Sequence, residues 1–183
     1  MSGNEPIARS GRRNVNILLA VASKHGSTHE IADVLANELC VAGHIVEVYN
    51  AAASPSPEAY DAVILGSAIY AGNWLSEAKQ FAERYQAELV GLPVWVFSSG
   101  PLGAENPQPH DDPQQLAAPL GNVPVRDHKV FVGKLDKSDL NMGERLIAKV
   151  IGAPTGDFRD WDAIRAWARE IATTLSVPAT TSR

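Results

Sequence analysis

The chain has 183 residues, of which 45% are hydrophobic and 20% charged, and its formal net charge is -5 at pH 7. This length suffices for one domain with a full hydrophobic core, and the composition is that of an ordinary globular protein. Nucleic-acid binding depends chiefly on clustered lysines and arginines, so the acidic charge argues against a nucleic-acid partner.

Both ends of the chain have the composition of tails. We predict a disordered tail over residues 1–14, a folded domain over 15–176 and a flexible tail over 177–183. The first apolar run lacks the cleavage site of a secretory signal, and no run reaches the roughly 20 apolar residues that span a bilayer. We therefore expect no transmembrane segment and a cytoplasmic location, while the sequence leaves the oligomeric state open.

The single cysteine and the five histidines do not form a metal-ligand pattern. Cys40 lies among apolar residues, where an unpaired thiol usually serves as a small buried side chain. His25 and His29 are four residues apart, but His25 precedes a predicted helix and no third ligand lies nearby. We predict no metal, and the sequence assigns no catalytic side chain.

Short apolar runs alternate with segments of helical period, which predicts βαβ units and a mainly parallel sheet. Residues 15–22 form the first strand, and their nearly continuous apolar character indicates a central position. Ser27 and Glu30 have the spacing of a capping box at the start of a helix that Gly43 ends. Residues 44–49 alternate as an exposed edge strand does.

The alternation continues through the second half of the chain. We predict a third strand over residues 62–66, then a helix with an apolar stripe from Leu75 to Leu89, and further strands over 93–97 and 129–133. The closing helix has an apolar stripe that begins at Trp161, behind Asp160 as N-cap. These elements predict a doubly wound α/β fold with helices on both faces of the sheet.

Two long intervals, residues 98–127 and 134–159, interrupt this pattern. Intervals of such length in compact domains are usually functional or disordered. Within the second, residues 140–151 have the apolar spacing of a short amphipathic helix. Packing on the core is its expected role, and transient contact with a membrane surface is the alternative.

In open α/β sheets, ligands bind at the carboxyl ends of the strands where the strand order reverses. The segment after the first strand contains Ser23, Lys24, His25, Gly26, Ser27 and Thr28. A helix start offers unpaired N–H groups and a positive dipole end, hydroxyls can donate further bonds, and Gly26 permits close backbone approach, so the segment suits a phosphate. Taken alone, it is equally compatible with an ordinary capped helix.

The segments after the third and fourth strands favour the ligand interpretation. They mix glycines with hydroxyl, apolar and aromatic residues, which suits a flavin ring with apolar faces and a polar edge. Tyr70 is the preferred stacking residue, whereas Trp74 is expected mainly to anchor the following helix in the core. The candidate contacts in these segments are Ser67, Ala68, Ile69, Tyr70, Gly72, Asn73, Ser98, Ser99, Gly100, Pro101, Leu102 and Gly103.

The run of residues 17–32 resembles the flavodoxin phosphate loop, Thr/Ser-x-Thr-Gly-x-Thr, followed by a helix. Ser23, Gly26 and Thr28 fall on its marked positions, and His25 stands where the family has a middle hydroxyl. The resemblance implies that the cofactor is flavin mononucleotide (FMN). It also implies a flavodoxin-like sheet of five parallel strands in the order 2-1-3-4-5.

Over residues 15–175 the chain also resembles the flavodoxin-like protoporphyrinogen dehydrogenases that pass electrons to quinones. The likeness rests on the phosphate loop, the strand from Tyr60 to Ser67 with Gly72 after it, and the ending Trp-Ala-Arg-Glu-Ile-Ala at 167–172. It implies an FMN-dependent oxidoreductase whose partners are a quinone, a porphyrinogen or a redox protein.

Two other functions are compatible with such a fold. A flavodoxin acting as an electron carrier gains from negative charge near its flavin, and residues 66–75 contain no carboxylate, although acidic residues in the interval 98–127 could restore it. A phosphoacceptor signalling domain needs an aspartate after the third strand and acidic residues after the first. Gly66-Ser67 and Ala22-Ser23 supply neither, so this function is the weakest of the three.

Overall fold

The computed structural model describes residues 14–70, 72–100, 117–135 and 156–176. Its helices and strands are β1 (Asn16–Ala22), α1 (Ser27–Val41), β2 (Ile45–Asn50), the 3-10 turns η1 (Ala51–Ala53) and η2 (Pro57–Ala59), β3 (Ala62–Tyr70), β4 (Asn73–Trp74), α2 (Ser76–Arg84), α3 (Gln86–Val90), β5 (Val94–Gly100), η3 (Ala118–Leu120), β6 (Val125–Val132), β7 (Lys134–Leu135), β8 (Gly156–Asp157) and α6 (Trp161–Ser176).

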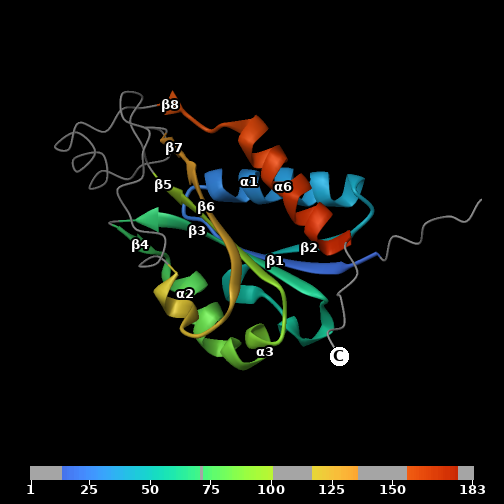
Figure 1. Ribbon diagram of the computed structural model, residues 1–183. Coiled ribbons are helices and arrows are strands. Elements are labelled where there is room, and N and C mark those ends of the chain that lie inside the picture. Colours follow the sequence, from blue (N-terminus) through green and yellow to red (C-terminus); the bar gives the residue numbers. More distant parts are fainter. Residues whose placement is uncertain (1–13, 71, 101–116, 136–155, 177–183) are drawn as a thin grey trace, which may run out of the picture.

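A parallel sheet lies at the centre, with α1 and α6 over one face and α2 and α3 over the other (Figure 1). The parallel strands follow the order β2-β1-β3-β5-β6, and the short β4 pairs antiparallel with the end of β3. Because β4 lies off this path, the five parallel strands have the predicted order 2-1-3-4-5, which is confirmed. The short strands β7 and β8 form a separate antiparallel pair.

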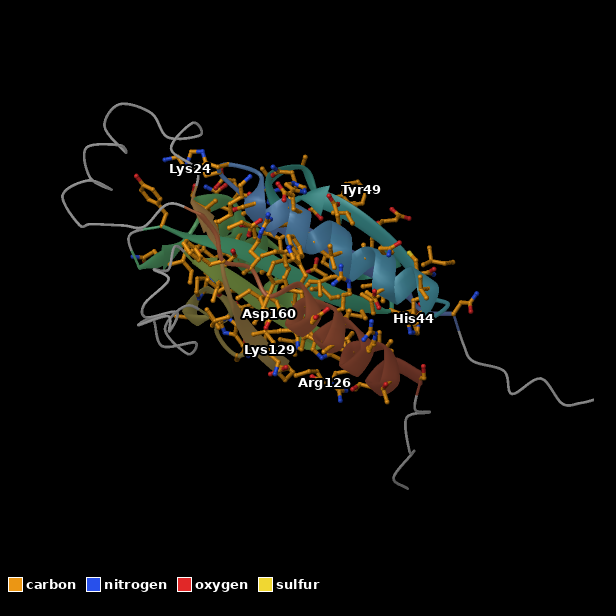
Figure 2. All side chains as sticks on the ribbon, turned by 90° about the horizontal axis from the view of Figure 1, so that it is seen from above. Lys24, His44, Tyr49, Arg126, Lys129 and Asp160 are labelled. Carbon is orange, nitrogen blue, oxygen red and sulfur yellow. The ribbon has the colours of Figure 1, made fainter. Side chains whose placement is uncertain are left out.

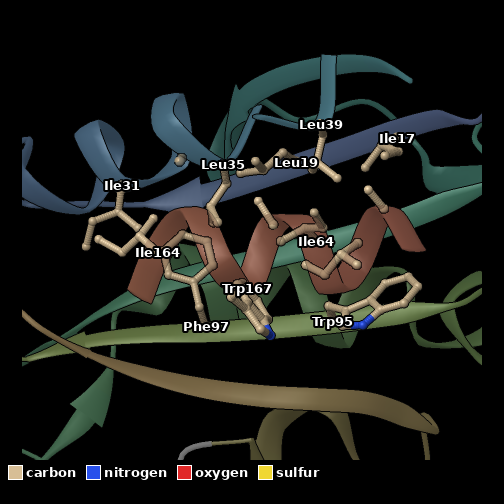
Figure 3. Close-up of a cluster of buried hydrophobic side chains, with 14 of the residues drawn as sticks. Ile17, Leu19, Ile31, Leu35, Leu39, Ile64, Trp95, Phe97, Ile164 and Trp167 are labelled. Carbon is tan, nitrogen blue, oxygen red and sulfur yellow. The ribbon is translucent and has the colours of Figure 1, made fainter. Parts of the chain in front are cut away.

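Strand β1 lies inside the sheet between β2 and β3, and its side chains from Ile17 to Ala22 are buried on both faces, as its sequence predicts. Ile17 and Leu19 face α1 and α6, where they join a cluster that includes Trp167 (Figure 3). Leu18 and Ala20 face the opposite cluster, against α2 and α3. Strand β2 lies at the end of the strand order beside β1, and it is the predicted edge strand.

Helix α1 begins at Ser27 as predicted, but the predicted capping box is wrong. Gly26 is the N-cap residue, in the left-handed region with φ of 82°, and no side chain caps the helix. Glu30 instead forms an ion pair with Arg159, 2.8 Å between Nη1 and Oε2. The helix ends near Gly43, which has φ of 97°.

Cys40 is exposed, because it lies on the outer face of α1, so its predicted burial is also wrong.

Strands β3 and β5 run further than predicted. The glycine and serine residues that mark predicted ends stay in the sheet, where Ser67 pairs with Ser98 and Ala68 with Ser99. The hydroxyls of Ser67 and Ser98 are satisfied inside the protein, so small polar side chains do not end these strands. After Tyr70 the chain turns back, and Asn73 pairs with Tyr70 in a hairpin instead of the predicted loop.

Two helical predictions have different outcomes. The single helix predicted from Leu75 to Leu89 is two helices, α2 and α3, because Tyr85 between them has a non-helical φ of −113° and ψ of 22°. Asp160 caps α6 as predicted, since its Oδ1 accepts hydrogen bonds from the backbone N–H groups of Asp162 and Ala163 at 3.1 and 2.9 Å.

Several predictions lie outside the described residues: both tails apart from Asn14, the amphipathic segment at 140–151, and Pro101, Leu102 and Gly103. Across the part of the chain that is described, no helix is both long enough and apolar enough to cross a membrane.

Gly66 lies in β3 against the ring of Phe97, and a Cβ atom at this position would overlap that ring. The ring cannot easily retreat, because it is fully buried and its centroid lies 6.2 Å from that of Trp167. We predict that Gly66→Ala lowers the free energy of unfolding by about 1–3 kcal/mol, as overpacked core substitutions do. Urea denaturation monitored by circular dichroism measures this change.

The matched control is Gly91→Ala. Gly91 has φ of −86°, and its added Cβ would meet only the Glu88 carbonyl oxygen at 3.6 Å, an ordinary contact. We expect its free energy of unfolding to be unchanged or raised by about 0.4–1 kcal/mol, because the unfolded chain loses freedom. Equal stability of the two variants would contradict this account of the core.

Candidate functional site

The carboxyl ends of β1, β3 and β5 lie side by side. Ala22 pairs with Ser67, and Ser67 pairs with Ser98, so the three strands reach this edge of the sheet together. The segments after β1, β3 and β5 were predicted to contact a ligand, and their described residues therefore meet at one edge of the sheet. This edge is where a doubly wound sheet binds its ligand.

The loop after β1 presents its backbone to solvent. Lys24, His25 and Gly26 are exposed, whereas Thr28 is buried with 1% of its surface exposed. The first helical hydrogen bond in this segment joins the Glu30 N–H to the Gly26 carbonyl oxygen at 3.0 Å. The N–H groups just before Glu30 are therefore the donors that a helix start leaves without an intrahelical partner.

Two hydroxyls beside this helix start are buried without a hydrogen-bond partner: Ser23 Oγ and Thr28 Oγ1. Leaving a buried hydroxyl unsatisfied costs about 1–3 kcal/mol, so such pairs are uncommon unless a ligand or an ordered water completes them. They lie on either side of Gly26 in the sequence, at two of the positions that the phosphate-loop pattern marks. The site therefore has the hydroxyl donors, backbone donors and positive helix end that a phosphate group needs.

The hydroxyls of the other two segments serve the framework instead. Ser67 Oγ accepts a hydrogen bond from the Leu75 N–H at 3.0 Å and donates one to the Ala68 carbonyl oxygen at 2.9 Å. Ser98 Oγ accepts a hydrogen bond from Trp74 Nε1 at 2.8 Å and lies 2.8 Å from His128 Nε2. These contacts tie β3, β4, β5 and β6 together at the edge of the sheet.

Trp74 is 3% exposed, so its predicted role as a core anchor is confirmed. His128 contributes to the same network, with its ring 6.0 Å from that of Trp74. Sequence reasoning missed His128, since nothing in the order of residues indicates that β6 carries it next to Ser98.

Ile69, Ser99 and Gly100 are also buried, and the Gly100 carbonyl oxygen accepts a hydrogen bond from the Gly133 N–H at 2.7 Å.

Tyr70, in contrast, is 45% exposed. Its ring lies under the ammonium group of Lys24, with Nζ 4.2 Å from the ring centroid. Gly72 and Asn73 are exposed in the same hairpin. Among the predicted contacts on β3, Tyr70 is thus the aromatic side chain open to a ligand.

Arg159 lies behind the loop, where sequence reasoning placed no functional residue. Its side chain is 2% exposed and makes two hydrogen bonds to the Asp157 carboxylate, Nε–Oδ1 at 2.8 Å and Nη2–Oδ2 at 2.6 Å. Its Nη1 also donates to the Ser27 carbonyl oxygen at 3.2 Å. The hydrogen bonds from Arg159 hold the pKa of the Asp157 carboxyl below its ordinary value, so the pair stays charged at neutral pH.

The described residues contain no group of three or more His, Cys, Asp or Glu side chains that could hold a metal ion. The described residues at this edge offer hydroxyls, backbone amides, an exposed aromatic ring and a lysine. Such a set suits an organic phosphate better than a cation.

Comparison with known proteins agrees with this geometry. Residues 18–162 match the flavodoxin domain family. The chain is 28% identical over 170 residues to the protoporphyrinogen IX dehydrogenase (quinone) of Escherichia coli strain K12, an alignment that covers 85% of this chain and 93% of that protein.

Solved structures show the same fold. An archaeal flavodoxin matches with a TM-score of 0.60 at 14% identity, covering 88% of this chain and 99% of its own. Oxidised Flavodoxin 2 from Bacillus cereus matches with a TM-score of 0.58 at 22% identity, covering 87% and 99%. Because the family match extends over most of the sequence, the predicted resemblance to the flavodoxin family is confirmed, and the chain belongs to the flavodoxin domain family.

Proposed function

We propose that this protein is an FMN-dependent oxidoreductase of the protoporphyrinogen and quinone type. The observation that carries the proposal is the pair of buried, unpartnered hydroxyls of Ser23 and Thr28 beside the start of α1. Membership of the flavodoxin domain family implies a flavin, and the name of the Escherichia coli relative suggests the porphyrinogen donor and the quinone acceptor.

The loop after β1 would hold the FMN phosphate mainly with neutral donors. The two hydroxyls and the unpaired N–H groups at the start of α1 can each donate to a phosphate oxygen, and the positive end of the helix dipole favours the anion. The left-handed conformation of Gly26 turns the backbone so that this helix starts directly at the sheet edge.

FMN, when bound, supplies the electron or hydride transfer. The protein supplies position: Tyr70 offers an aromatic face, and the hairpin pairing of Tyr70 with Asn73 fixes where that ring stands. The buried contacts of Trp74 and Ser98 keep the hairpin against β5. No protonating side chain is required, because the cofactor carries the chemistry.

The charge at this edge favours an enzyme over an electron carrier. Residues 66–75 contain no Asp or Glu, and Lys24 places a positive charge 4.2 Å from the Tyr70 ring centroid. A cation near a flavin stabilises the reduced anion and raises the reduction potential, whereas a carrier of low potential benefits from negative charge there. The arrangement suits a flavin that accepts electrons from an organic donor.

The proposal is tested by adding FMN to the purified protein, desalting it and recording the visible spectrum. We expect retained flavin bands, and we expect the loaded protein to oxidise protoporphyrinogen IX with a quinone as acceptor. Retained FMN without porphyrinogen or quinone turnover would instead support a flavodoxin electron carrier with a redox protein as partner. A protein that keeps no flavin would overturn the proposal.

We predict that Gly26→Ala weakens FMN binding about tenfold or more, because a side chain strains the left-handed backbone that shapes the phosphate loop. The equilibrium dissociation constant from quenching of flavin fluorescence measures this change. Gly43→Ala is the matched control, since Gly43 also has a positive φ, 97° against 82°, and neither position has an atom within 4 Å of an added Cβ. Equal FMN binding by the two variants would contradict the assignment of the loop.

We predict that Lys24→Gln lowers the midpoint potential of bound FMN by roughly 20–40 mV, since a positive charge near the flavin is removed. Spectroelectrochemical titration measures the potential. Arg126→Gln is the control, because it removes one exposed positive charge at the start of β6, well away from Lys24 (Figure 2). A potential that shifts equally in both variants, or in neither, would remove Lys24 from the flavin environment.

A further inference from the structure

Arg159 is a buried charge that the cofactor chemistry does not use. Burying a guanidinium is costly unless partners replace its water, and here three side chains supply those partners. The Asp157 carboxylate is bidentate to it, Glu30 Oε2 lies 2.8 Å from Nη1, and the Trp161 ring centroid lies 4.3 Å from Cζ. Contacts with these three side chains hold the guanidinium in place.

These partners join two distant parts of the chain. Asp157 belongs to β8, which pairs with β7 through Lys134 and closes the long interval between the last parallel strand and α6. Ser27 and Glu30 belong to the first turn of α1, next to the candidate phosphate loop. Arg159 therefore connects the C-terminal part of the chain to the helix start at the site.

The contact with Ser27 has a direct consequence for the site. The Ser27 carbonyl and the Thr28 N–H share one planar trans peptide, in which the two groups point in opposite directions. A guanidinium that holds the Ser27 oxygen at 3.2 Å therefore sets the direction of the Thr28 N–H. Thr28 also carries one of the two unpartnered hydroxyls, so both of its donors depend on this peptide.

Arg159 is poorly placed to attract a phosphate with its own positive charge. The carboxylates of Glu30 and Asp157 together more than balance the charge of Arg159, and its side chain is 2% exposed. A cation at a helix N-terminus is also unfavourable for the helix dipole. The charge of Arg159 is thus already taken up by protein carboxylates, and its contact with the loop is the hydrogen bond to the Ser27 carbonyl oxygen.

We propose that Arg159, held by Asp157, is a positioning residue that aims the first turn of α1 at the FMN phosphate. The inference rests on the proposed function, since it assumes that the loop binds FMN. It assigns to β8 and the segment before α6 a role in cofactor affinity.

The test compares FMN with riboflavin, which lacks the phosphate, by fluorescence titration of wild type and Arg159→Met. We expect Arg159→Met to raise the Kd for FMN about tenfold and to change the Kd for riboflavin less than about twofold. The variant should fold, because methionine fills similar volume and the carboxylates of Glu30 and Asp157, with side chains 52% and 40% exposed, can regain water.

Two further variants make the comparison specific. Asp157→Asn weakens the bidentate contact without removing Arg159, and we expect it to lower the preference for FMN over riboflavin in the same direction. Arg169→Met is the control, since Arg169 joins α6 to α1 through Glu38, Nε to Oε2 at 3.1 Å, away from the loop. Its preference should equal that of wild type.

The unfavourable outcomes are distinguishable. If wild type binds neither flavin, the proposed function fails and this inference fails with it. If wild type prefers FMN, but Arg159→Met and Asp157→Asn weaken both flavins equally or leave both unchanged, only the positioning role is overturned. The positioning role is also overturned if Arg169→Met lowers the preference as much as Arg159→Met does.

Discussion

Strand β1 is covered by side chains on both faces, and this constraint determines where polar side chains can lie along this part of the chain. Along the strand from Ile17 to Ala22 every side chain is buried in one of the two clusters. Polar side chains therefore flank this buried run, with Asn16 before it and Ser23 after it at the carboxyl end. There the chain must also reverse to cover the sheet, and Gly26 allows α1 to start at once. The candidate site thus arises from the same geometry that builds the core.

The polar groups at this edge of the sheet fall into two classes. Ser67 and Ser98 have partners inside the protein and hold strands and the hairpin in place. Ser23 and Thr28 are buried without partners for their hydroxyls. Hydrogen-bonded framework residues beside donors without a partner suit a preorganised ligand site, because a ligand can then bind the free donors without rearranging the protein.

Patterns that depend on neighbouring residues were predictable from the sequence. The central strand follows from the continuous apolar run of residues 15–22, the edge strand from alternation, and the α6 cap from Asp160. The order of the parallel strands followed from the resemblance of the phosphate loop to a known family. The burial of Trp74 matches its predicted role as a core anchor, while Tyr70, the predicted stacking residue, is 45% exposed and its contact with a flavin stays a prediction.

Two of the failures, the capping box and the predicted end of β5, come from contacts with residues distant in sequence. Glu30 has the spacing of a capping residue, but Arg159 binds it instead. A serine such as Ser98 is typical of a loop, but in the sheet its hydroxyl accepts a hydrogen bond from Trp74 and lies 2.8 Å from His128 Nε2. The identity of these partners depends on the folded topology, which local patterns do not contain.

A crystal structure of the protein with FMN bound tests the proposed site most directly. We expect phosphate oxygens within hydrogen-bond distance of Ser23 Oγ and Thr28 Oγ1, with the flavin ring against Tyr70. A flavin bound elsewhere, or a phosphate that leaves both hydroxyls without a partner, would contradict it.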